Sequence, residues 1–356
     1  MEKMFKRTLI GAAVASLTLA GSVQARPATE TIDLYGQIAI SVAQNAQTGE
    51  QAQAKPIDAT KKKDKVVVMD NESRVGVRGS AQFERGPKLI WQLEGGNVGD
   101  DGKESGFGVR DTYGGFEFED AGRVRFGRML TPMFEVLDGY TGQSSGAGFN
   151  VGNTGRINYD RQSNFGRYDS AVYGGFSFAV GGGRGNEDKA GSNVYSGSAQ
   201  FQKGVFTGKV GYERVYDVDN ADLIGGNGDG EALIAGLNLD FDSFGGHLAY
   251  ITGKATSNDA SGSAGTKELK QSAYKVGAYY TGIEHWTFNL NYAMSTDLER
   301  NGVSEKNSDQ AITGQAMYAL DPLAVVYVRV VHQTDSTEQY GDYTDTGWRV
   351  GMEYYF

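Results

Sequence analysis

Cysteine is absent from the 356 residues of this sequence, proline occurs five times and histidine three times. The absence of cysteine excludes disulfides and thiolate metal sites. The three histidines, His247, His285 and His332, lie far apart in the sequence, so we expect no clustered transition-metal site and no cofactor. After residue 25, no apolar run reaches the roughly 20 residues that a membrane-spanning helix needs.

The first 25 residues have the layout of a secretory signal peptide. A positively charged start is followed by an apolar stretch over 9–21 and by a small-x-small cleavage site that ends at Ala25. We therefore predict a signal peptide over 1–25 and a mature domain over 26–356. A secreted domain without disulfides needs another source of stability, and a closed barrel of hydrogen-bonded strands provides one.

The charge balance is acidic. The whole chain has a formal net charge of −10, and the signal peptide holds Lys3, Lys6 and Arg7 against Glu2, so the mature domain carries −12. This balance argues against a nucleic-acid partner, because nucleic acids are bound by basic surfaces.

Alternation with a period of two residues runs through the mature domain. In 347–356, Trp348, Val350 and Met352 share one parity, whereas Arg349 and Glu353 share the other. The same pattern recurs in 31–44, 88–94 and 233–241. One face of each segment suits lipid and the other suits water, which is typical of transmembrane β-strands.

The connections between these segments alternate between short turns and long polar loops. Eight long loops with short turns between them predict sixteen antiparallel strands. Proline cannot donate to a sheet ladder, and all five prolines fall outside the proposed strands. The long loops are expected at 45–64, 96–106, 131–155, 183–193, 217–230, 257–271, 298–308 and 336–345.

A soluble secreted β-sandwich or β-helix would also alternate. A sandwich rarely needs sixteen strands, and a solenoid would show a fixed repeat that this sequence lacks. We therefore favour an all-β fold, a sixteen-stranded antiparallel transmembrane β-barrel.

Several short segments resemble the general trimeric porins of Gram-negative bacteria, including the enterobacterial and neisserial types. Their order and spacing follow that family over essentially the whole mature domain, which ends on an aromatic residue, Phe356. The segments are 32–37 (IDLYGQ), 72–79 (ESRVGVRG), 110–115 (RDTYGG), 125–128 (RFGR), 161–164 (RQSN) and 167–170 (RYDS).

The resemblance implies a homotrimer of barrels in the cell outer membrane, each with its third loop folded inward to narrow a water-filled channel. Ions and small hydrophilic solutes would cross by passive diffusion, and the protein would not be an enzyme. The implied partners are outer-membrane lipid, lipopolysaccharide and the barrel-assembly machinery, which would read Phe356 as its signal.

A porin constriction needs fixed charges of opposite sign across a narrow water path. Arg74 and Arg110 match the family's wall arginines, and Arg78 shares the parity of Arg74. Arg156 and Arg161, near the end of the third loop, are further basic candidates. The loop departs from the enterobacterial pattern, because 139–155 contains no acidic residue. Its acidic candidates are Glu135 and Asp138, which could equally be structural acids at the loop base.

Other functions remain open at this point. A solute-specific porin for oligosaccharides would need an aromatic track along the lumen, for which Tyr35 and Tyr355 have the right parity. A surface adhesin or phage receptor would use the external loops. A barrel protease or phospholipase is disfavoured, because the G-x-S-x-G match at 142–146 has no helix and no histidine nearby.

Overall fold

The computed structural model describes residues 31–46, 65–96, 106–141, 149, 161–185, 188–219, 227–258, 267–337 and 341–356. The predicted signal peptide and Arg156 lie outside these residues, so both remain predictions. Within the described part, no helix is both long and apolar enough to cross a membrane.

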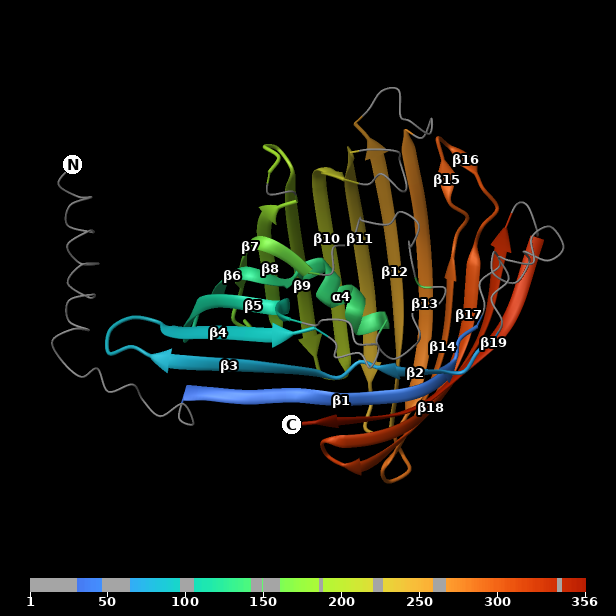
Figure 1. Ribbon diagram of the computed structural model, residues 1–356, viewed down its shortest axis with the longest axis horizontal. Helices are drawn as coiled ribbons and strands as arrows, with labels where there is room; N and C mark the ends of the chain where they lie inside the picture. Colours follow the sequence, from blue (N-terminus) through green and yellow to red (C-terminus); the bar gives the residue numbers. More distant parts are fainter. Residues whose placement is uncertain are drawn as a thin grey trace. The chain divides into compact units, whose positions relative to one another are not determined.

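The described strands form one antiparallel sheet that closes on itself (Figure 1). The long strands pair in sequence order, with β14 paired to β17, and β1 closes the ring on β19 with Gln37 opposite Tyr355 and Gln44 opposite Trp348. The strands are β1 (Ile32–Gln44), β2 (Val68–Asn71), β3 (Arg74–Gln82), β4 (Lys88–Gly95), β5 (Phe107–Phe118), β6 (Gly122–Leu130), β7 (Arg161–Asp169), β8 (Phe176–Arg184), β9 (Asn193–Lys203), β10 (Phe206–Asp219), β11 (Asn227–Asp240), β12 (Phe244–Ser257), β13 (Glu268–Tyr280), β14 (Trp286–Ser295), β15 (Glu299–Arg300), β16 (Val303–Ser304), β17 (Asp309–Asp321), β18 (Ala324–Thr337) and β19 (Gly341–Tyr355).

These segments make sixteen barrel strands. β2 and β3 are one strand interrupted at Glu72 and Ser73, and both parts pair with β1. At the interruption, Ser73 Oγ accepts a hydrogen bond of 3.0 Å from the backbone N–H of Ala39, which keeps that donor satisfied. β15 and β16 form a short hairpin beyond the end of β14, and β15 pairs with β13. The predicted sixteen-stranded barrel is therefore confirmed.

Side chains alternate between the two faces of the wall. On β1, Ile38, Ile40 and Val42 are each 38% exposed and point outward, whereas Gln37 and Ser41 are buried and point inward. This arrangement is the reverse of a soluble protein, and it is stable where apolar surroundings cover the outer face.

One helix, α4 (Pro132–Thr141), lies inside the barrel. Thr131 caps it, because its Oγ1 accepts a hydrogen bond of 3.3 Å from the N–H of Phe134, and Pro132 occupies the first helical position, where no N–H is needed. The helix packs against the inner face of β9, β10 and β11. The third long connection thus turns inward, as expected.

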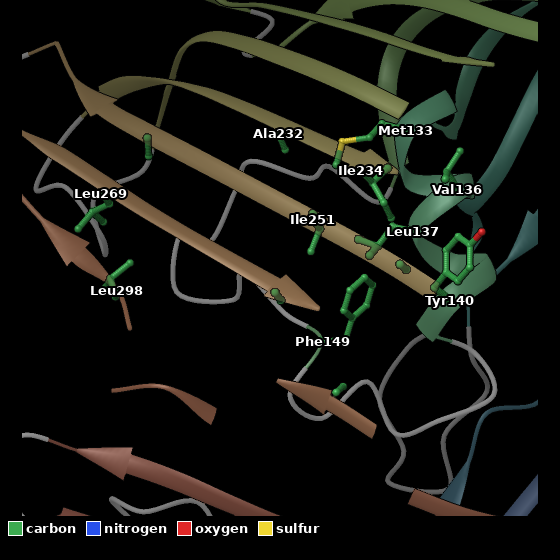
Figure 2. Close-up of a cluster of buried hydrophobic side chains, with 14 residues drawn as sticks. Met133, Val136, Leu137, Tyr140, Phe149, Ala232, Ile234, Ile251, Leu269 and Leu298 are labelled. Atoms are coloured by element: carbon green, nitrogen blue, oxygen red, sulfur yellow. The ribbon is translucent and has the colours of Figure 1, made fainter. Parts of the chain in front are cut away.

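The apolar face of α4 fixes its position on the wall. Its buried residues are Pro132, Met133, Val136, Leu137 and Tyr140. All of these except Pro132 join a cluster of buried side chains that includes Ile234 of β11, Ile251 of β12 and Phe149 (Figure 2).

Two glycines of the wall let α4 approach this closely. A Cβ at Gly236 would lie 2.2 Å from the ring of Tyr140, and a Cβ at Gly211 would lie 3.1 Å from Cα of Met133. Any larger residue at Gly236 would displace the tyrosine.

Candidate functional site

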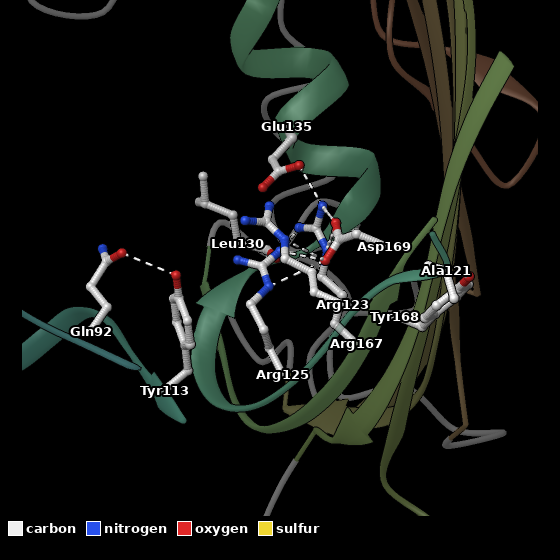
Figure 3. A network of polar contacts seen from close by, with 10 residues as sticks. All are labelled: Gln92, Tyr113, Ala121, Arg123, Arg125, Leu130, Glu135, Arg167, Tyr168 and Asp169. Carbon is white, nitrogen blue, oxygen red and sulfur yellow. Dashed lines mark hydrogen bonds and ion pairs between the residues drawn. The ribbon is translucent and has the colours of Figure 1, made fainter. Parts of the chain in front are cut away.

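Arginine side chains gather along the inner surface of β3 to β7, and Figure 3 shows the three of them that lie near Glu135 of α4, Arg123, Arg125 and Arg167. We call this set the arginine strip. It consists of Arg74, Arg78, Arg110, Arg123, Arg125, Arg161 and Arg167.

The first section of the arginine strip surrounds Glu94 of β4. Arg110 donates to this carboxylate through Nε, and Nε of Arg74 lies 4.0 Å from the same oxygen. The hydroxyl of Tyr35 donates to its other oxygen at 2.8 Å, and the guanidinium of Arg78 lies 5.0 Å from the centre of the Tyr35 ring. Glu94 and Tyr35 therefore fix the positions of three cationic side chains.

The second section joins β5 to β7. Nε of Arg161 lies 2.7 Å from Oδ1 of Asp111. On the same strand as Asp111, the hydroxyl of Tyr113 donates to Gln92 at 3.1 Å, and the guanidinium of Arg125 lies 5.0 Å from the Tyr113 ring.

Asp169 at the end of β7 is the centre of the third section (Figure 3). Its two oxygens lie 2.7 Å from Nη2 of Arg125 and 2.6 Å from Nη2 of Arg167, and Nε of Arg123 is 3.4 Å away. Arg167 also contacts Oε2 of Glu135 at 2.5 Å. This contact connects the arginine strip to α4.

Glu135 and Asp138 lie one turn apart on the exposed face of α4, opposite its buried apolar face. Both residues are exposed to the lumen, and Glu135 also pairs with Arg167 of the wall. The helix thus carries a negatively charged face above a positively charged wall.

The wall holds α4 at both of its ends. Near the N-terminus, the N–H of Met133 donates to Ser196 Oγ at 3.0 Å. Near the C-terminus, the hydroxyl of Tyr140 donates to Asn238 at 2.8 Å, and Lys275 Nζ donates to the Tyr140 carbonyl. A cation at this carbonyl is also favoured by the helix dipole. Burial raises the pKa of Tyr140 to about 12, so its hydroxyl stays protonated at neutral pH.

The structure brings most of the predicted basic residues together. Arg74, Arg78 and Arg110 meet around Glu94 and Tyr35, and Arg161 pairs with Asp111. The described residues do not include Arg156. We expected Arg74 and Arg110 to face Glu135 and Asp138, and the carboxylate that contacts both arginines is Glu94.

Sequence reasoning missed several members of the site. These are the carboxylates Glu94, Asp111 and Asp169 and the arginines Arg123, Arg125 and Arg167. A signal was present in the period of two, because Glu94 has the parity of the water-facing Lys88 and Gln92. The parity gives the face of each residue, but it cannot give the partner on the next strand.

Phe356 lies at the seam of the barrel. Its backbone exchanges two hydrogen bonds with Gly36, at 2.9 and 3.1 Å, and its ring is 44% exposed. Among the described residues, no group of three or more histidine, cysteine, aspartate or glutamate side chains is arranged to hold a metal ion.

Comparison with known proteins identifies the family. The family model for Gram-negative porins matches residues 9–339. The chain belongs to the Gram-negative porin family. Chitoporin from Vibrio furnissii is 32% identical over 389 residues that cover 100% of both chains. Major outer membrane protein P.IA from Neisseria meningitidis serogroup B is 26% identical and covers 92% of this chain and 82% of its own.

Solved porins share the fold. An anion-selective porin from Comamonas acidovorans superposes with a TM-score of 0.70 at 19% identity, over 91% of this chain and 99% of its own. OmpT from Vibrio cholerae in its trimer form gives a TM-score of 0.67 at 16% identity, over 92% of this chain and 99% of its own. The resemblance stated from sequence motifs is thus confirmed, and this porin is an outer-membrane channel.

Proposed function

We propose that this porin lets ions and small hydrophilic solutes diffuse through a constriction between the arginine strip and the acidic face of α4. The observation that carries the proposal is the position of α4 inside the barrel, with Glu135 and Asp138 on its exposed face and Glu135 in contact with Arg167 of the arginine strip. Opposite charges across a narrow water path produce a transverse field, which orders water and dipolar solutes.

In this proposal Arg74, Arg78, Arg110 and Arg161 form the basic side, and Arg156 is a further candidate. Glu135 and Asp138 form the acidic side. None of these groups needs to donate a proton or attack a substrate, since passage requires only fixed charge and water. We therefore propose a channel without enzymatic activity.

We further propose that the channel assembles as a homotrimer, which the trimer form of the Vibrio cholerae OmpT supports. Outer-membrane lipid and lipopolysaccharide would surround its apolar outer face. Phe356 is exposed at the barrel seam, where the assembly machinery could reach it before the wall closes.

Single-channel conductance in a planar lipid bilayer tests this function. The expected result for the folded protein is an ohmic conductance that rises in groups of three equal steps. Folding is verified separately by the shift in gel mobility of unheated barrels. A folded barrel that carries no current would refute the diffusion channel, and single isolated steps would refute the trimer.

A porin specific for oligosaccharides is the second candidate, and the 32% identity to chitoporin favours it. It would need aromatic rings free to stack on sugars. Tyr35 is covered by Arg78, and Tyr140 is buried between α4 and the wall. Tyr355 is 40% exposed, which leaves a short track. Oligomers of N-acetylglucosamine would interrupt the current of a specific porin in discrete blockades and would leave that of a general porin unchanged.

A further inference from the structure

We infer that this channel prefers anions to cations, and that the arginine strip determines the preference. The inference rests on the proposed function, because it specifies the class of solute that passes the same constriction. It runs against the formal net charge of the chain, −10, which alone would suggest a preference for cations.

The charges of the arginine strip do not cancel. Its seven arginines gather around three carboxylates, those of Glu94, Asp111 and Asp169. Lys88 and Glu117 at the end of this wall form an ion pair, with Nζ 2.9 Å from Oε2, and add no net charge. Even when both carboxylates of α4 are counted against it, the arginine strip keeps an excess of positive charge.

The wall behind α4 does not reverse this sign. Lys209 lies on the inner parity of β10, and its Nζ would be 3.8 Å from a Cβ at Gly139 of the helix. Lys275 is buried at the C-terminal end of α4. Glu213 is fully buried as well and offsets Lys275, so Lys209 is the positive charge left over among these three residues.

A third group of charges faces the lumen from β18 and β19. Arg349 is paired with Asp70 at 2.8 Å, and Arg329 donates to the neutral side chain of Gln315 at 2.6 Å. Glu72 and Glu353 also lie near Arg329, so this group holds two positive and three negative charges. It lowers the excess of the arginine strip and α4 from two positive charges to one and does not reverse its sign.

The local charge outweighs the charge of the whole chain because of screening. At physiological salt the Debye length is about 8 Å, so charges on distant loops are largely screened from an ion at the constriction. Inside a water-filled lumen with a low-dielectric wall, nearby charges are screened less and their field is focused. The ion preference therefore follows the arginine strip.

The size of the effect can be set from Coulomb's law. A single charge about 6 Å from an ion in water changes the probability of finding that ion there by about threefold. Removing one exposed arginine of the arginine strip should therefore lower the ratio of chloride to potassium permeability by up to about threefold.

The reversal potential in a potassium chloride gradient measures that ratio. For the native porin we expect a reversal potential whose sign indicates a preference for chloride over potassium. The test variant is Arg74→Gln combined with Arg123→Gln, since Glu94 keeps Arg110 and Asp169 keeps Arg125 and Arg167. The matched control is Arg214→Gln combined with Lys254→Gln, which removes the same charge from the outward parity of β10 and β12.

The inference predicts a loss of chloride preference in the test variant and none in the control. A conducting native channel that prefers potassium would overturn the inference and leave the diffusion channel intact. Equal shifts in the test variant and the control would also overturn it. If the test variant does not fold, Glu135→Gln combined with Asp138→Asn replaces it. Removal of these two negative charges should raise the chloride preference. An unchanged preference would overturn a constriction between the arginine strip and α4. Absence of current from folded native protein would instead refute the proposed function.

Discussion

Gly236→Ala should unseat α4 and widen the channel. The added Cβ would lie 2.2 Å from both Cζ and Oη of Tyr140, whereas ordinary contacts begin near 3.4 Å, so the ring must move by more than 1 Å. Overpacking of this kind costs about 1 to 3 kcal/mol. The move also breaks the hydrogen bond from Tyr140 to Asn238, which contributes about 1 kcal/mol. The seated state should therefore lose about 2 to 4 kcal/mol relative to the unseated one, a change of roughly 30-fold to several hundredfold in their ratio.

In single-channel recordings, the larger population of the unseated state should appear as a larger mean conductance and increased current noise. The size cut-off for polyethylene glycols that enter the channel should rise with it. Gly314→Ala is the matched control, because it also adds a methyl group to a central strand but meets no atom within 4 Å. If Gly236→Ala conducts as quietly as Gly314→Ala and keeps the same size cut-off, α4 does not limit the channel.

Three further substitutions test the contacts around α4 and the wall. Lys275→Met removes the donor to the Tyr140 carbonyl and should increase the current noise without changing the size cut-off. Current noise equal to that of the native channel would argue against an anchoring role for Lys275. Arg167→Gln should destabilise the folded barrel by about 1.5 to 3 kcal/mol, because it removes the ion pair with Glu135 and one of the two buried arginines beside Asp169, which keeps Arg125. Arg123→Gln, at an exposed site, should cost less than about 1 kcal/mol, and comparison of their thermal unfolding decides this. Asp335→Asn should raise the unfolding temperature at pH 7, because Asp309 and Asp335 are direct cross-strand neighbours whose charges repel; an unchanged or lower unfolding temperature would contradict this.

The barrel could be predicted from the sequence because each strand carries its own signal. β1 and the part of β19 from Gly347 alternate between apolar and polar residues, and both were located from that alternation. The expected loop at 336–345 was too long, because β18 extends to Thr337 and β19 begins at Gly341, where the sequence does not alternate. The break between β2 and β3 was not predicted. At the break, the N–H of Ala39 on β1 donates to Ser73 Oγ in place of a backbone carbonyl. This hydrogen bond can be recognised only once the pairing with β1 is known.

The helix inside the lumen was expected only as an inward loop. Its sequence carries ordinary helix signals, namely a Thr131 cap, Pro132 at the first position and apolar residues at Met133, Val136, Leu137 and Tyr140. They were hidden by the surrounding glycine-rich loop. The partners of the arginines could not be predicted. Irregularities between Leu93 and Gly95 and between Gly127 and Met129 shift the strand register, and the register decides which side chains are neighbours on adjacent strands.

Exposure and pairing vary together along the arginine strip, and this separates structural from functional charge. The side chains of Arg125 and Arg167 are 5% and 2% exposed, and each makes close contacts with Asp169. Arg74 and Arg123 are 34% and 41% exposed, and their distances to a carboxylate are longer, 4.0 and 3.4 Å. A buried guanidinium must be paired because its desolvation is costly, whereas a guanidinium in water needs no partner. The excess charge of the arginine strip is therefore carried by its solvent-exposed residues, such as Arg74 and Arg123, and these are also the residues that face a passing ion.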